Sequence, residues 1–317
     1  MLQRLRPSLT ESEREFLGPV QREEMLLQLD QATTMHRLRA TISDRLALLG
    51  DARPGVGVRR DGLPDILWCR VPGGEVLLQS DSDIISAEGG TARGVEFPVQ
   101  PFWIARYPVT WAQYRAFLEA PDGYDRRQWW RGLAYGMIRP GRQFRQRDNH
   151  PAENVSWYDA VAFCRWLTTR LGYEVRLPLE WEWQQAATGG DPANTYPWGP
   201  RWDHSRVNTS ESALDRSTAV GAYPRGASPV GALDMGGNVW EWCANEYERP
   251  QRTGLSGTAY RALRGGSWFS TQDEAQTAYR YSSLPFNRYY NFGFRLASSE
   301  VGVGALPSSV VRIGADD

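Results

Sequence analysis

The residues of this sequence best suited to act as nucleophiles or soft metal ligands are three cysteines, Cys69, Cys164 and Cys243. They lie far apart along the chain and form no Cys-x-x-Cys pair. This spacing disfavours both a thiolate zinc site and a disulfide framework. We therefore expect three reduced cysteines that are at least partly buried.

Histidine and carboxylate chemistry is equally sparse. The three histidines, His36, His150 and His204, are widely separated, so a three-histidine site would need the N-terminal region to reach the core. We expect His150 to make ordinary structural hydrogen bonds. Glu180 and Glu182 stand at an expected helix start, where carboxylates commonly serve the helix dipole. No G-x-S-x-G, P-loop or H-E-x-x-H motif occurs.

Charge and hydropathy exclude some partners. The formal net charge is −1, and all 36 basic residues are arginine, so there is no global electrostatic case for binding nucleic acid. No apolar run is long enough for a signal peptide or a membrane-spanning helix. We expect a cytoplasmic protein with no membrane partner.

The elements that must position any site follow from composition and local signals. With 14 tryptophans, 14 tyrosines, 31 glycines and 20 prolines, the chain suits a loop-rich domain packed around large rings. In the main domain, residues 66–81 predict two strands joined by a Pro-Gly-Gly turn. Helices are expected after Thr110, from Ser156 to Gly172, and from Pro178 to before Gly189.

We expect four parts along the chain: a helical arm at 1–50, a linker at 51–61, a main domain at 62–297 and a frayed tail at 298–317. Thr10 and Glu13 form a capping box in the arm, and apolar residues recur at helical spacing until Gly50. The arm is expected to be a helical hairpin packed on the main domain, with a partner-binding arm as the alternative.

Residues 121–150 form an Arg- and Trp-rich irregular stretch and carry the only basic patch of the sequence. Long insertions of this kind are usually functional or mobile. The two interpretations are a solvated structural insertion and a contact surface.

Seven motifs then identify a family resemblance. They occur in order between residues 102 and 297, within the expected main domain of about 235 residues: FWIARYPVTWAQYRAFL, NHPAENVSWYDAVAFCRWL, EVRLPLEWEWQQAATGG, YPWG, LDMGGNVWEWC, LRGGSW and NFGFRLA. The sequence resembles the formylglycine-generating-enzyme/sulfatase-modifying-factor family, with Leu179 where a capping threonine is usual. The resemblance implies an α+β, C-type-lectin-like fold that is low in regular structure. Within VWEW, strand alternation would place Trp240 and Trp242 on one face and Glu241 on the other.

The same resemblance shows which chemistry is missing. Enzymes of the family hold copper with two cysteines after the GGS-aromatic motif, and those positions fall here on Ser270 and Ala275. A hydroxyl and a methyl group cannot hold copper(I), which prefers soft thiolates. The iron-dependent sulfoxide synthases of the family need clustered histidines. We therefore expect no catalytic cofactor and no enzymatic activity.

Structural calcium is also implied by the resemblance. One site maps onto the side chains of Asp234 and Glu241 and the carbonyl groups of Gly237 and Val239, and hard oxygen ligands suit calcium. The alternative is that Glu241 bonds to backbone amides.

The segment after GGSW is the one that could carry function. Its tyrosine, serine, asparagine and phenylalanine residues are typical of a binding surface, and they are crowded between Arg280, Pro285, Arg288 and Gly293, which we interpret as framework. The alternative, that the rings are core, suits Phe292 and Phe294. This segment, from GGSW to GFRL, resembles the variable proteins of diversity-generating retroelements. In those proteins, adenine-directed mutagenesis scatters such residues over a fixed scaffold. The candidate diversified positions are Phe269, Ser270, Thr271, Asp273, Tyr279, Tyr281, Ser282, Ser283, Leu284, Phe286, Asn287, Tyr289, Tyr290 and Asn291.

The leading hypothesis is a non-catalytic, receptor-like protein, expected to be a monomer, whose 269–291 surface binds a ligand, in the first place a protein. One rival is a metal-dependent oxidase of the formylglycine-generating or sulfoxide-synthase kind. The other is a fixed accessory or sensor module whose helical arm docks a partner.

Overall fold

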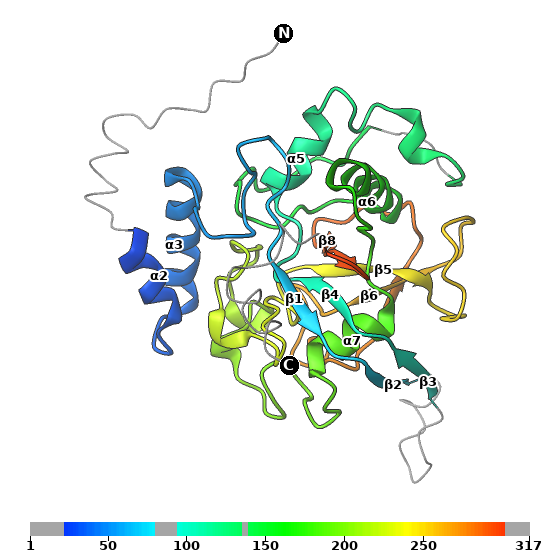
Figure 1. Cartoon of the computed structure of the whole chain (residues 1–317). Coiled ribbons are helices and arrows are strands. Elements are labelled where there is room, and N and C mark those ends of the chain that lie inside the picture. The colour runs from blue at the N-terminus through cyan, green and yellow to red at the C-terminus, as the bar shows by residue number, and fades with distance from the viewer. Residues whose placement is uncertain (1–21, 80–93, 135–138, 302–317) are drawn as a thin grey trace, which may run out of the picture.

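The structure, a computed structural model, describes residues 22–79, 94–134 and 139–301. Short strands and helices connected by long irregular segments form a mixed α+β domain, with a pair of helices to one side (Figure 1). The expected fold class is confirmed. The capping box of Thr10 and Glu13 lies outside the described residues.

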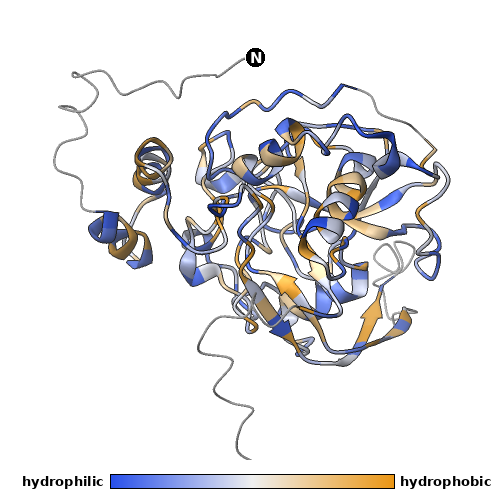
Figure 2. Ribbon diagram, turned by 45° about the horizontal axis from the view of Figure 1, so that its top comes forward, coloured by the Kyte–Doolittle hydropathy of each residue, from blue (hydrophilic) through white to orange (hydrophobic). Residues whose placement is uncertain are grey.

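Helices α2 (Arg22–Asp30) and α3 (His36–Leu49) make up the described part of the expected helical arm, whose residues 1–21 lie outside the described ranges. Gly50 follows α3 with φ 83°, a conformation that favours glycine. The arm has a small apolar cluster of its own, built from Met25, Leu29, Ile42 and Leu46. Figure 2 shows hydrophobic residues on both arm helices and on the sheets of the main domain.

The segment 51–61 has no helix or strand, as expected of a linker, but it packs closely on the main domain. Val56 is buried in a small cluster with Tyr107 and Val220. Asp51 forms an ion pair with Arg53 at 2.6 Å, and both side chains are largely buried. The segment is therefore an ordered part of the domain surface.

Two of the three sheets found among the described residues use the first strands of the domain. One sheet has the order β1-β4-β9, and the other pairs β2 with β3. The strands are β1 (Trp68–Val71), β2 (Gly74–Leu78), β3 (Val95–Val99), β4 (Phe102–Ala105) and β9 (Ala297–Ser298). The two strands expected in 66–81 are confirmed, and they belong to different sheets because each finds its partner later in the chain.

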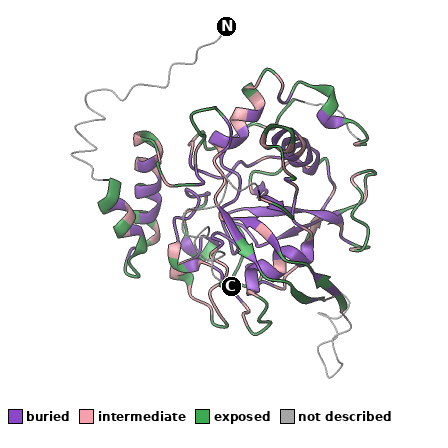
Figure 3. Cartoon of the chain, viewed as in Figure 1, coloured by how far each residue is buried: buried purple, intermediate pink, exposed green. Residues whose placement is uncertain are grey.

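The third sheet has the order β7-β6-β5-β8 and carries the candidate site. Its strands are β5 (Trp240–Glu246), β6 (Arg261–Arg264), β7 (Tyr281–Ser283) and β8 (Phe292–Gly293). β5 pairs antiparallel with β6 and parallel with β8. Figure 3 shows β5 buried along nearly its whole length.

Helix α5 (Trp111–Glu119) begins at a Thr110 capping box, and α6 (Trp157–Leu171) begins at a box of Ser156 and Asp159. Gly172 ends α6 in the left-handed conformation, as the sequence predicts. Helix α7 (Glu180–Thr188) begins after Leu179, whose backbone N–H donates to Glu182 at 2.8 Å. The part of the chain that the structure describes also contains four 3₁₀ turns: η1 (Arg127–Trp130), η2 (His204–Arg206), η3 (Ser210–Ser212) and η4 (Pro224–Gly226).

Two large apolar clusters fill the domain on either side of β5. Trp240 and Trp242 pack into the cluster that includes α6, whereas Glu241 faces Trp183 of α7. The alternation predicted for VWEW is confirmed. Trp129 and Trp130 of the 121–150 stretch are buried in the α6 cluster, so part of that stretch is structural.

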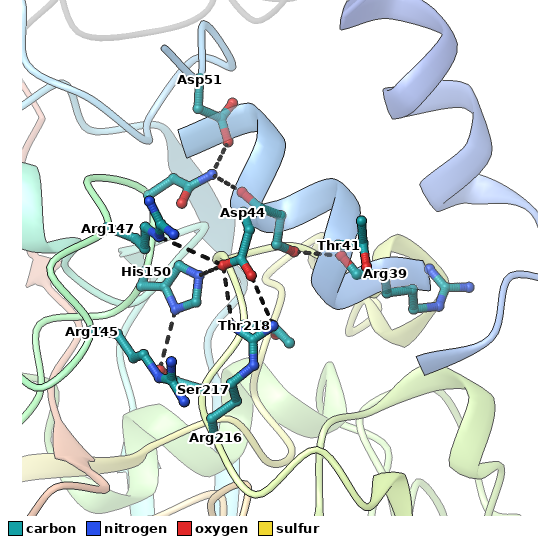
Figure 4. A network of polar contacts seen from close by, with 12 residues as sticks. Arg39, Thr41, Asp44, Asp51, Arg145, Arg147, His150, Arg216, Ser217 and Thr218 are labelled. Atoms are coloured by element: carbon teal, nitrogen blue, oxygen red, sulfur yellow. Dashed lines mark hydrogen bonds and ion pairs between the residues drawn. The ribbon is translucent and has the colours of Figure 1, made fainter. Parts of the chain in front are cut away.

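The arm meets the main domain through polar contacts (Figure 4). Asp44 of α3 forms an ion pair with Arg216 at 2.9 Å, and its Oδ1 lies 3.6 Å from Nε2 of buried His150. Asn149 donates from Nδ2 to the Ser43 carbonyl at 3.1 Å and to Asp51 at 2.9 Å. The arm therefore docks through partly buried ion pairs and hydrogen bonds.

Candidate ligand-binding surface

The candidate positions between residues 269 and 291 fall into three groups. The exposed group is Phe269, Thr271, Asp273, Tyr281, Phe286, Tyr289 and Tyr290. The partly buried group is Tyr279, Ser282, Leu284, Asn287 and Asn291. The buried group is Ser270 and Ser283. The fold thus brings most of the candidate side chains to the surface.

Ser270 and Ser283 correct the predicted surface, because both side chains are enclosed by the fold. Ser270 Oγ lies 3.3 Å from Ser267 Oγ, and its carbonyl accepts the Ser210 N–H at 2.9 Å. Ser283 lies in β7 and accepts from Asn287 Nδ2 at 2.9 Å. Serine is as typical of a binding surface as the residues at the exposed positions, so residue type alone could not show that these two serines are buried.

One group of rings rests on the framework side chains Trp240 and Phe292, which are both buried. Tyr281 stacks on Trp240 with ring centroids 4.9 Å apart, and Tyr279 lies 6.0 Å from the same ring. Tyr289 meets Phe292 edge to face at 4.9 Å. The tyrosines are therefore anchored on one side while their other edges stay accessible.

A second group of rings rests on Trp268 of the GGSW motif. Phe269 lies 5.7 Å from Trp268, and Tyr290 lies 5.5 Å from it. Phe144 meets Tyr290 edge to face at 6.2 Å. Sequence reasoning missed Phe144, and its only signal was a place inside the basic 121–150 stretch.

Buried ion pairs hold the segment that carries these rings, as the framework interpretation predicts. Arg288 donates to both carboxylate oxygens of Asp159, at 2.7 and 2.9 Å. Arg280 donates to both oxygens of Glu180, at 2.7 and 2.9 Å. Glu180 also pairs with Arg264 and is fully buried. The dipole role expected of Glu180 is thus secondary to its role as a buried anchor.

A third carboxylate supports the segment around Phe144. Glu153 Oε1 accepts from the backbone N–H groups of Phe144 and Arg145, at 3.1 and 2.9 Å. Its Oε2 accepts from Ser217 Oγ at 3.2 Å. Burial raises the pKa of Glu153 to about 7, although these hydrogen bonds oppose the shift.

The positions that hold copper in family enzymes are both buried here. The Ser270 hydroxyl group lies beside that of Ser267, and the Ala275 methyl group is fully enclosed. Cys69, Cys164 and Cys243 are free and buried, as expected, and burial raises the pKa of each thiol. None of these groups is a thiolate ligand that could replace the missing pair.

The histidines form two separate sites. The arm brings His36 to His204, with Nε2 and Nδ1 3.1 Å apart, and His36 Nδ1 lies 2.8 Å from the Tyr223 hydroxyl. His150 lies apart, with Nδ1 3.3 Å from Ser217 Oγ. Within the described residues, no group of three or more histidine, cysteine or acidic side chains could hold a metal ion.

The calcium residues lie together but their oxygens are engaged. Arg295 donates to both oxygens of Glu241 at 2.5 and 2.6 Å, and Trp183 Nε1 donates to Oε2 at 2.7 Å. Asp234 accepts the Gly221 N–H at 2.6 Å, and the Gly237 carbonyl accepts the Val239 N–H at 2.9 Å. A cation at Glu241 would compete with a buried guanidinium, so this donor set fits Arg295 better than calcium. Calcium binding, which the family resemblance predicts, is tested below against this pairing of Glu241 with Arg295.

The fold and the site define a C-type-lectin-like domain that presents anchored aromatic rings at one surface. Residues 63–300 match the sulfatase-modifying factor enzyme 1-like domain, and the chain belongs to this family. The solved structure of Treponema denticola variable protein 1 shares the fold with a TM-score of 0.57 and 19% identity, over 74% of this chain and 95% of that one.

Two relatives show that the family includes proteins with and without activity. The mouse (Mus musculus) inactive C-alpha-formylglycine-generating enzyme 2 is 31% identical over 280 residues, covering 74% of this chain and 86% of its own length. The hercynine oxygenase of Mycolicibacterium thermoresistibile is 35% identical over 238 residues, covering 63% of this chain and 51% of its own. The chain thus spans about half of that oxygenase.

Among the described residues, no helix has the length and apolar character needed to span a bilayer.

Proposed function

We propose that this chain is a non-catalytic ligand-binding protein that presents a diversified surface, residues 269–291, on a fixed C-type-lectin-like scaffold. The observation that carries the proposal is the pairing of exposed rings with buried supports. Tyr281 and Tyr289 are 40% and 47% exposed, yet each contacts a buried ring of the third sheet. Rigid, half-anchored tyrosines give large contact areas at low entropic cost.

The scaffold supports variation at these positions. The side chains that fix the segment, Arg280 and Arg288, bind carboxylates of α7 and α6, which lie outside the segment. Changes at Tyr289 or Phe286 would therefore alter specificity without unfolding the domain. The fold shared with the Treponema denticola variable protein agrees with this arrangement.

The proposal is tested by selection from a displayed library of random peptides on the immobilised full-length protein. The expected result is enrichment of specific peptides, which Tyr281→Ala, Tyr289→Ala and Tyr290→Ala together abolish. The matched control is Tyr260→Phe, at an exposed tyrosine outside the segment. Peptides that bind equally to the triple variant would contradict the proposed site.

An oxidase function is the second candidate, and the 35% identity to hercynine oxygenase is the observation that favours it. It predicts copper or iron retained in stoichiometric amount and oxygen consumption with a thiol. The buried hydroxyl of Ser270 and the methyl group of Ala275, at the positions of the copper ligands, support the non-catalytic alternative.

A fixed accessory or sensor module is distinguished from the proposed receptor by sequence variation, because such a module would show none in the 269–291 segment.

A further inference from the structure

The aromatic surface does not end at residue 269 or 291. Phe144 is 59% exposed and touches Tyr290, which leans on Trp268, which in turn touches Phe269. We call these four side chains the ring strip. One of its ends therefore belongs to the 121–150 stretch, outside the diversified segment.

The chain around Phe144 is held in place. Glu153 accepts two backbone hydrogen bonds at Phe144 and Arg145, and Asn154 Nδ2 donates to the Arg142 carbonyl at 3.0 Å. At Gly141, an added Cβ would approach the Asn154 carbonyl oxygen to 1.9 Å, so only glycine fits this close approach. Phe144 is thus presented by an ordered segment, as a binding group requires.

Charge changes sign along the ring strip. At the Phe144 end, Arg139, Arg142 and Arg145 are exposed. The ion pairs found within the described ranges include none of these three arginines. At the Phe269 end, Asp273 is exposed and Glu211 accepts the Gln272 N–H at 2.9 Å.

We propose that residues 139–147 form the constant half of the binding surface and select a protein partner with a carboxylate beside an apolar side chain. This inference rests on the proposed function. The apolar side chain of the partner would cover the ring strip, and its carboxylate would face Arg142 and Arg145. Exposed charges at the rim of an interface set specificity and association rate more than affinity. The constant half would thus bias every diversified version toward acidic partners.

The test compares the random-peptide library on the wild-type protein and on the Arg142→Glu/Arg145→Glu variant. We expect Asp and Glu enriched about threefold beside apolar residues on the wild type, the effect of one or two exposed ion pairs. The variant should lose this preference and still enrich peptides. Both arginine side chains are exposed, so the substitutions do not change core packing. Because the charge of Arg145 acts on buried Glu153, the free energy of unfolding of the variant is measured alongside and the single Arg142→Glu variant is compared with it. Arg70→Glu, at an exposed position of β1 in another sheet, is the matched control.

The outcomes separate this inference from the proposed function. Peptides without an acidic preference, or a preference unchanged in the double variant, would overturn the role of residues 139–147 and leave the tyrosine surface standing. Failure of the wild type to enrich any peptide over the triple tyrosine variant would overturn the proposed function itself. If added salt weakens binding of the selected peptides to the wild type but not to the double variant, both the role of residues 139–147 and the proposed tyrosine surface are supported.

Discussion

Arg288 and Asp159 form a two-pronged ion pair, at 2.7 and 2.9 Å, between the exposed ring segment and the first turn of α6. Asp159 is fully buried and also accepts from Tyr124 and from the backbone and hydroxyl group of Ser156. The ion pair of this arginine inside the segment of exposed rings thus ties the candidate surface to helix α6.

Removal of this pair tests its role as framework. Arg288→Gln leaves Asp159 buried without its cation, and loss of one partner of a buried pair costs about 3–5 kcal/mol. We expect urea unfolding to show a loss of that size. Arg142→Gln, at an exposed arginine, should change the free energy of unfolding by less than about 0.5 kcal/mol. Equal effects of the two substitutions would contradict the framework role.

Glu153 predicts a pH dependence of stability. Its pKa is about 7 in the folded protein and near 4.5 when unfolded, so the stability it contributes is present at low pH and lost as pH rises through 7. The difference in unfolding free energy between the wild type and Glu153→Gln should shift by about 3 kcal/mol between pH 4.5 and 8. His150, whose pKa burial lowers, acts in the opposite direction and is common to both proteins. A difference that does not vary with pH would contradict the account.

Much of the fold is predictable from the sequence because its signals are local. The capping boxes at Thr110 and Ser156 and the glycine after α6 lie within a few residues of the helix ends that they define. Residues 264–268 are an exception: their glycines predict the start of a short core strand, whereas β6 ends at Arg264 and Gly265–Trp268 lie beyond it without strand structure. The pairing of β1 with β4 and of β2 with β3 joins segments that are separated along the chain, so local signals do not predict it.

The site was predictable in its location and only partly in its members. Residue types identify the 269–291 segment, but they cannot show that Ser270 and Ser283 turn inward. Glu180 meets Arg264 and Arg280, which lie 84 and 100 residues further along the chain, so local reasoning finds only its place at a helix start. Phe144 joins the surface for the same reason, through a contact with Tyr290 that no local pattern contains.

The polar contacts of the arm predict that Asp44 controls its docking. Burial alone would raise the pKa of Asp44, but its pairing with His150 and Arg216 lowers it below the usual range. Asp44→Asn should remove the charge that holds Arg216 and speed hydrogen exchange in α3 while α6 stays protected. Glu24→Gln, at an exposed site of α2, is the control. Unchanged exchange in α3 would show that the arm docks by other contacts.

Calcium binding is tested by the competition between a cation and Arg295 for Glu241. The pairing seen here predicts the same melting temperature in millimolar calcium and in a chelator. Glu241→Gln should cost about 3–5 kcal/mol in either condition, since Arg295 is left buried without its partner. A melting temperature that rises with calcium in the wild type and not in Glu241→Gln would establish the metal site instead.

The central claim, a diversified binding surface on a fixed scaffold, is tested most directly by sequencing this gene and its flanking DNA from independent isolates. We predict adenine-derived substitutions at the exposed codons between 269 and 291, beside a near-copy template repeat. Codons of the supports, Trp268, Arg280 and Arg288, should stay constant. A uniform segment without a repeat, or substitutions that fall equally on the supports, would contradict the account.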